Sequence, residues 1–183
     1  NGEDYILSIV VGLGGGSNAA VTGSVPVTTI KNDLDAHIDS DEDILVGGDL
    51  VVEATQNDTL IIYAGAISGS KTAAVGLSAT NVIISGQIKA YLDVKNLKTN
   101  SVTILTNKKD KFSFGSVAGS VSGSISVTGA ELTILVNTVM SSYIADDSNL
   151  SITKSLTIKA NHEIDSTSST GQLAGASTTA IGA

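Results

Sequence analysis

The sequence predicts an all-β fold, a right-handed parallel β-helix (β-solenoid) built from repeats of about 52–54 residues. A recurring phrase carries this prediction: LDAHID at Leu34–Asp39, IKAYLD at Ile88–Asp93 and MSSYIA at Met140–Ala145. Each phrase is followed by a short polar loop and then a run rich in β-branched residues, which favour strands. No window shows the 3.6-residue apolar stripe of a helix.

The repeats divide the chain into successive copies. We expect a partial copy at 1–56, copies at 57–107 and 108–160, and a partial copy at 161–183. The chain opens and closes inside a repeat, so residues 1–183 are expected to form a single β-solenoid segment cut from a longer repeat protein.

Aligning the copies gives columns of apolar residues, and we expect these columns to form a continuous buried core. Within the recurring phrase, Leu34, Ala36 and Ile38 alternate with polar residues, as in a strand with one buried face. The apolar columns are Ile6/Leu60/Phe112, Val21/Val75/Val127/Ile181, Ile30/Ile84/Val136, Leu34/Ile88/Met140, Ile38/Leu92/Ile144, Leu50/Val102/Leu156 and Val52/Ile104/Ile158.

The stretches rich in Gly, Ala and Ser, at 64–80 and 115–130, resemble linkers in composition. Apolar residues nevertheless recur at even spacing within them, for example at Val117, Val121 and Ile125. We therefore predict strands with small inward residues, which form a thin part of the cross-section. The length differences between copies fall in one loop, at Ser40–Asp43 and Asp146–Asn149.

The period leaves the number of rungs per repeat open. Two rungs per repeat would make a rod of roughly 30–35 Å, at about 4.8 Å per rung. One wide, flattened rung per repeat satisfies the same period.

The charge of the chain argues against some partners. The net charge is −8, all ten basic residues are lysines and there is no Arg, whereas a phosphate-binding face needs clustered Lys or Arg, so we expect no nucleic-acid partner. The longest apolar runs, such as Ile6–Val11, are too short to span a membrane as a helix, so we expect no membrane insertion by this segment.

The chain resembles the large secreted filamentous haemagglutinin-like and leukotoxin-like bacterial adhesins, exported by autotransporter or two-partner routes. The residues that carry the resemblance are the valine–glycine–serine stretches Val21–Val27 and Val117–Val127, the phrase Lys89–Asp93 and the run Gly47–Thr55. The resemblance implies a β-helical shaft that is extracellular, at the bacterial cell surface or secreted. It implies attachment to host cells or other bacteria, and it carries over no catalytic residue.

One outward column is the candidate ligand face. His37, Tyr91 and Tyr143 share it, and stacked rings along a solenoid could bind a host-cell surface protein or glycan. The alternative is a stack between rungs that contributes only stability, about 0.5–1 kcal/mol per pair. The other partners that we expect are the neighbouring rungs of the parent chain, with end-to-end association of the open ends.

The acidic stretch Asp33–Asp43 resembles a calcium site, because hard cations prefer several carboxylate oxygens. The later copies replace most of these acids, which favours a solvated acidic face, and we expect no metal and no cofactor. His162 has no acid or nucleophile at a recognisable spacing, so we expect it at the surface.

Two other functions remain as alternatives: a segment of a leukotoxin-type virulence protein acting on host cells, and a carbohydrate-active β-helix enzyme. An enzyme of the second kind needs paired carboxylates, or a basic residue beside acids, on adjacent rungs. No acid pair recurs in register and the chain has no Arg, so we expect no enzymatic activity.

Overall fold

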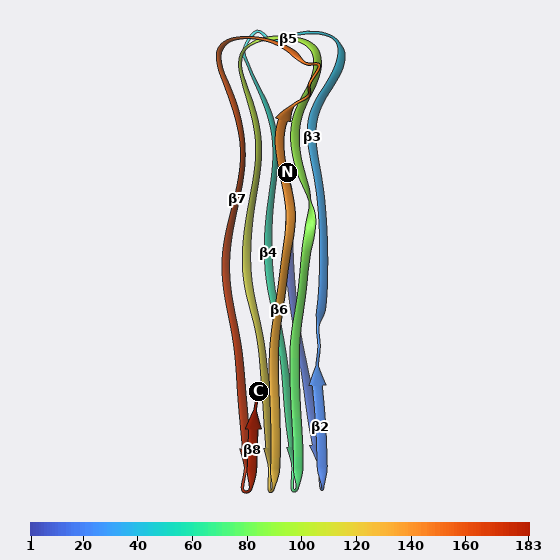
Figure 1. Cartoon of the computed structure of the whole chain (residues 1–183). Coiled ribbons are helices and arrows are strands. Elements are labelled where there is room, and N and C mark those ends of the chain that lie inside the picture. Colours follow the sequence, from blue (N-terminus) through green and yellow to red (C-terminus); the bar gives the residue numbers. More distant parts are fainter.

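The computed structural model describes all residues 1–183, and it is all-β (Figure 1). Every pair of neighbouring strands is parallel, and together the strands form one curled sheet. The strands are β1 (Gly2–Gly16), β2 (Ala19–Ser24), β3 (Val27–Leu45), β4 (Asp49–Ser70), β5 (Ala73–Ser122), β6 (Ile125–Ile144), β7 (Asn149–Ala176) and β8 (Thr179–Gly182).

The chain runs along the length of the molecule and back, forming two layers. In Figure 1, β1 descends to the lower end, β2 and β3 return to the upper end, and β4 descends again. The long β5 then supplies both a returning and a descending segment. One layer therefore consists of β1, β4, Ser101–Ser122 and β7, and the other of β2, β3, Ala73–Lys98, β6 and β8.

Each repeat makes one wide coil. Paired residues lie one sequence repeat apart, as in Gly2 with Gln56 and Asp49 with Ser101. With about 4.8 Å between neighbouring strands, the stacked coils are only about 15 Å deep. The rod of 30–35 Å assumed two rungs per repeat, and the structure has one. The long dimension runs along the strands.

The register confirms the sequence alignment of the copies. Ile30, Ile84 and Val136 pair in succession, as do Leu34, Ile88 and Met140. The length differences lie at the upper turns, where the register shifts between Ser40 and Asp43. Of 118 backbone hydrogen bonds, 106 lie within the strands, so main-chain ladders join successive coils along most of the chain.

The upper and middle parts hold large side chains between the layers. One buried cluster contains Val52, Ala54, Ile88, Ala90, Leu92, Val94, Leu97, Val102 and Ile104. A second contains Ile30, Leu60, Ile62, Val82, Ile84, Phe112 and Phe114. Both combine residues from the two layers, so the aliphatic columns bury a shared core.

The lower part has small inward residues, as the composition predicts. Ser68 Oγ donates a hydrogen bond across the layers to the Ala20 carbonyl oxygen at 3.0 Å. Thr80 Oγ1 donates to the Gly115 carbonyl oxygen at 2.9 Å. Such short side chains reach the opposite backbone directly, so the layers lie close together here.

One expected core column points outward instead. Val21, Val75, Val127 and Ile181 do pair in succession, but Val21 is 74% and Ile181 is 50% exposed. Val117 and Val121 are exposed as well, because Ser116, Ala118 and Ser120 occupy the inside. The thin interior has room only for small side chains, so the alternation places the larger ones on the surface.

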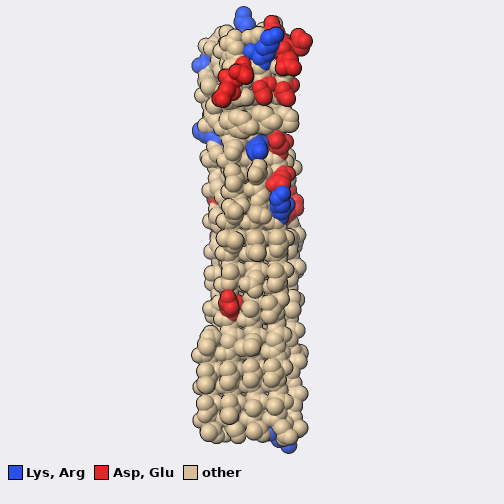
Figure 2. Space-filling model, turned by 45° about the vertical axis from the view of Figure 1, so that its right-hand side comes forward, with Lys and Arg blue, Asp and Glu red and all other residues tan.

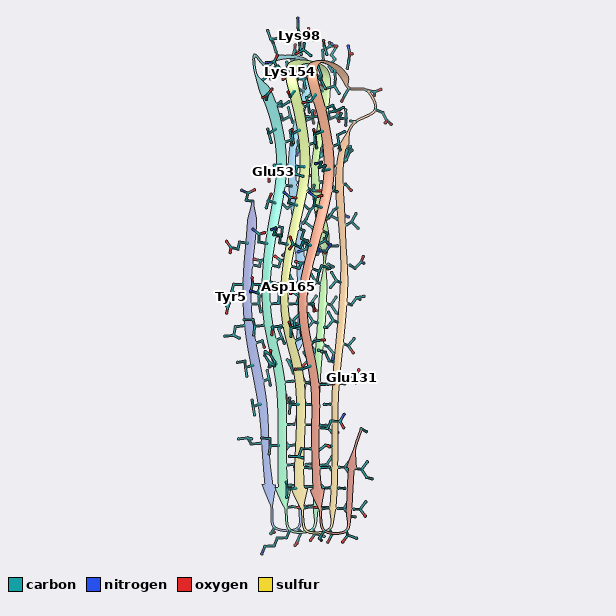
Figure 3. All side chains as sticks on the ribbon, turned by 90° about the vertical axis from the view of Figure 1, so that its left-hand side faces the viewer. Tyr5, Glu53, Lys98, Glu131, Lys154 and Asp165 are labelled. Atoms are coloured by element: carbon teal, nitrogen blue, oxygen red, sulfur yellow. The ribbon has the colours of Figure 1, made fainter.

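Charged side chains gather toward the upper end of the molecule, and Figure 2 shows that the lower half of this face is nearly free of them. The sequence explains the division, because residues 59–88 contain only Lys71 as a charged residue and residues 112–145 only Glu131. Figure 3 shows Glu131 in the lower half, whereas Lys98 and Lys154 lie at the upper end. The structure contains no helix with the length and hydropathy of a transmembrane span.

Candidate functional site

The structure brings His37, Tyr91 and Tyr143 together as one column on the outer face. His37 pairs with Tyr91, and Tyr91 pairs with Tyr143 on the next coil. Both pairs of ring centroids are 4.9 Å apart, with interplanar angles of 8° and 4°. The rings stack because their separation is close to the distance between neighbouring parallel strands.

Acidic residues surround this aromatic column. His37 Nδ1 lies 3.0 Å from Asp35 Oδ1, within hydrogen-bonding distance. Desolvation of the phenol raises the pKa of Tyr91, and the negative charges of Asp35, Asp39 and Asp93 act in the same direction. Tyr91 therefore presents a neutral hydroxyl at physiological pH.

The stacking decides which parts of the aromatic column can meet a ligand. Both faces of the Tyr91 ring are covered by its neighbours, whereas sugar rings pack against open aromatic faces. Lateral contact is left to ring edges and hydroxyl groups, together with the flanking carboxylates. A ligand role for His37, Tyr91 and Tyr143 stays a prediction, and the geometry favours polar contacts over stacking on a sugar.

The acidic stretch does not form a metal cage. Asp33 accepts hydrogen bonds from Lys31 Nζ at 2.8 Å and from the Gln87 backbone N–H at 3.0 Å. The bond from Lys31 is the main cause that lowers the pKa of Asp33. No group of three or more His, Cys, Asp or Glu residues has an arrangement that could hold a metal ion.

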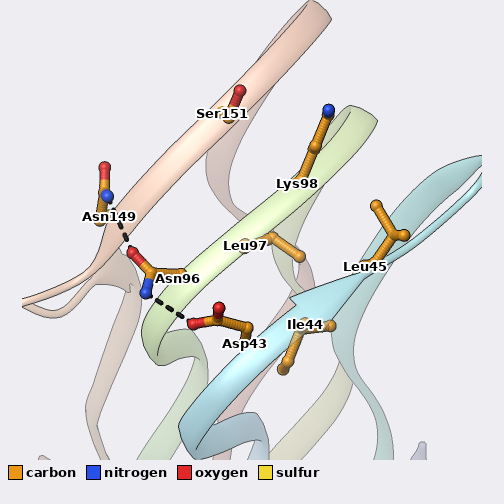
Figure 4. Close-up of a pocket in the computed structure, with 8 residues that line it drawn as sticks. All are labelled: Asp43, Ile44, Leu45, Asn96, Leu97, Lys98, Asn149 and Ser151. Atoms are coloured by element: carbon orange, nitrogen blue, oxygen red, sulfur yellow. Dashed lines mark hydrogen bonds between the residues drawn. The ribbon is translucent and has the colours of Figure 1, made fainter.

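A ladder of amides runs along the upper turns (Figure 4). Asn96 Nδ2 donates to Asp43 Oδ1 at 2.7 Å, and Asn149 Nδ2 donates to Asn96 Oδ1 at 2.9 Å. A shallow pocket beside the ladder is lined in part by Leu45 and Lys98. The ladder aligns the turns of three coils, and we assign it a structural role.

A second polar cluster lies between the two layers of the sheet, in the space between the two apolar clusters. Lys108 Nζ contacts Asp58 Oδ2 and lies 2.6 Å from Asp110 Oδ1. The Lys108 side chain is 1% exposed, and both carboxylates are fully buried. Fully buried lysine is rare in proteins unless it is paired, so this cluster is a specific feature of the chain.

Neighbouring side chains satisfy the remaining atoms of these carboxylates. Gln56 Nε2 donates to Asp58 Oδ1 at 2.6 Å, and Asn32 Nδ2 lies 3.3 Å from each Asp58 oxygen. On the next coil, His162 Nε2 lies 2.6 Å from Asp110 Oδ2. We call Lys108, Asp58, Asp110, Gln56, Asn32 and His162 the buried polar cluster.

This cluster was not predicted, and the expectation that no acid pair lies in register was wrong, because Asp58 pairs directly with Asp110 on the next coil. His162 is exposed as a residue, as expected, but its ring nitrogen reaches a buried carboxylate. His162 has an acid partner, and its side chain is only 25% exposed. The partner lies 52 residues away, a separation that only the stacking of coils explains. A signal was present, because Asp58 and Asp110 each precede an inward residue, Leu60 or Phe112, by two positions.

The comparisons with known proteins return no likeness: no family model, curated protein or solved structure matches the chain.

Proposed function

We propose that the chain is a structural shaft segment of a bacterial adhesin that is secreted or exposed at the cell surface. The observation that carries the proposal is the register: one coil per repeat, held by main-chain ladders over the whole chain. The resemblance to filamentous haemagglutinin-like and leukotoxin-like adhesins supports the same function.

The shape of the coil suits a stiff support. Each repeat lengthens the stack by only about 4.8 Å, but each coil is wide in cross-section. Resistance to bending rises with the cross-section. Strands such as β1 and β7 are paired on one side only, so further coils can add to the same ladder. In this function the segment has no enzymatic activity, and its partners are neighbouring coils.

Binding of the labelled, folded chain to host cells and to a glycan array tests the proposal. A shaft segment is expected to bind neither, at any concentration at which a known adhesin domain binds. The matched variant replaces His37, Tyr91 and Tyr143 with leucine. Binding by the wild type that this variant loses would contradict a purely structural role and would place a host-cell protein or glycan site on the aromatic column.

A further inference from the structure

We propose that Lys108 and Asp58 form an intramolecular amide (isopeptide) bond that links two adjacent coils. Asp58 lies on β4 and Lys108 on β5, and the Lys108 amine contacts the Asp58 carboxylate directly. The bond would be a covalent modification of the folded chain, and it is independent of the adhesin proposal.

The position of the two reacting groups favours condensation. An amine and a carboxylic acid do not condense readily in water, but fixed neighbours react with effective concentrations that reach about 10⁵ M or more. The strand ladder fixes both residues, because Gln56 pairs with Lys108 and Asp58 pairs with Asp110. Lys108 therefore reaches diagonally to Asp58 without any movement of the backbone.

The donors on Asp58 suit the transition state. As the amine attacks the Asp58 carboxyl carbon, negative charge develops on the oxygen that does not leave. Asp58 Oδ1 is already held by Gln56 Nε2 at 2.6 Å and Asn32 Nδ2 at 3.3 Å. These amides would stabilise that oxygen, and Oδ2, which contacts Lys108, would leave.

Asp110 is the catalytic residue in this step, because it touches the reacting nitrogen at 2.6 Å. It takes a proton from the Lys108 ammonium group and delivers it to the Asp58 carboxylate, which gives a neutral amine and a neutral acid. After attack, Asp110 takes a proton from the nitrogen and passes it to Oδ2. One C–N bond forms, one C–O bond breaks, one water leaves, and Asp110 returns to its starting state.

The dry surroundings favour the product. A buried ammonium–carboxylate pair carries a large desolvation cost, whereas an amide is neutral. Leu60 and Phe112, the next inward residues on the two strands, are 0% and 3% exposed. The released water can escape, and hydrolysis of the amide would require water to re-enter.

Intact mass spectrometry of the purified, folded chain under denaturing conditions tests the proposal. We expect a mass lower than the sequence mass by one water molecule. Trypsin should then release peptide Asn32–Lys71 joined to Thr99–Lys109, with no cleavage after Lys108. A folded chain of full sequence mass would overturn the proposal, and so would a water loss that leaves Asn32–Lys71 free.

Two variants separate chemistry from packing. Asp110→Asn keeps the shape of the side chain but cannot shuttle protons, so it should have the full sequence mass of the variant and cleave after Lys108. Lys109→Met, at the exposed neighbouring lysine, should still lose one water. If Asp110→Asn fails to fold, the linked peptide of the wild type still decides whether the amide bond forms. If folded Asp110→Asn forms the bond as completely as the wild type, Asp110 has no part in the mechanism.

Discussion

The ring of Tyr63 lies across Gly115 on the next coil, and the Tyr63 hydroxyl is 2.7 Å from Ser113 Oγ. Tyr63 and Gly115 are direct partners in the parallel register. The same arrangement recurs more loosely where Val117 lies over Gly171 and Val121 over Gly175. A large outward side chain on one coil thus covers a glycine on the next, which limits the exposure of backbone in the half of the molecule that carries few charges.

Gly115→Ala should destabilise the chain. A Cβ at this position would lie 2.5 Å from the Tyr63 ring, so the ring would have to turn away and lose its contact with Ser113. We expect a loss of about 1 kcal/mol or more in the free energy of unfolding, as for a crowded site. Chemical denaturation measures it.

Gly69→Ala is the matched control, because it lies in a strand and nothing would be within 4 Å of its Cβ. We expect Gly69→Ala to cause no loss in the free energy of unfolding. A gain of a few tenths of a kcal/mol is consistent with reduced conformational freedom of the unfolded chain. Equal effects at Gly69 and Gly115 would show that the Tyr63 contact does not matter.

Ile84→Asp tests the assignment of the buried columns. Ile84 is 1% exposed and lies between Ile30 and Val136, so the aspartate would be a buried charge without a partner. We expect a loss of about 3–5 kcal/mol in the free energy of unfolding. The adjacent variant Ile83→Asp points outward, where Ile83 is 40% exposed, and should cost less than about 1 kcal/mol. Thermal unfolding of both variants measures the difference. Unfolding midpoints that fall equally below that of the wild type would contradict the column assignment.

The columns were predictable because the alternation of Leu34, Ala36 and Ile38 fixes which side of a strand is buried, and the period fixes which residues align. The number of coils per repeat could not be predicted, since one wide coil and two narrow coils give the same period. The outward valines were missed because apolar residues were assigned to the core by type. In the thin half, serine and alanine occupy the interior, as Ser116 and Ala118 show.

The aromatic column was predictable for the same reason as the core: position 37 recurs as Tyr91 and Tyr143. The buried polar cluster was not found, because a lysine and two aspartates contradict the usual composition of inward positions. Such a set is tolerable inside a protein only where the buried groups are partners of one another, as Lys108 is of Asp58 and Asp110.

Removing the middle ring should cost more than removing an end ring. Tyr91 stacks on both His37 and Tyr143, whereas Tyr143 stacks on one ring only. With about 0.5–1.5 kcal/mol for each aromatic pair, Tyr91→Leu should cost about twice the stacking energy lost in Tyr143→Leu. Urea unfolding of the two variants and of the double variant measures the coupling. Additive losses in the double variant would show that the two tyrosines do not interact.

The titration of Tyr91 should make the chain less stable in alkali. Its pKa is raised in the folded state, first by desolvation and then by nearby negative charges, so folding favours the protonated phenol. Its contribution to stability is complete below the pKa of about 10 of an unfolded tyrosine, and it is lost as the pH rises through the higher folded value.

Tyr91→Phe keeps the ring and removes the ionisable group. Above about pH 10, the wild type should therefore lose stability more steeply than Tyr91→Phe, as measured by urea unfolding at a series of pH values. Parallel curves for the two proteins would mean that the environment of the phenol is the same in the folded and unfolded chains, contrary to the aromatic column described above.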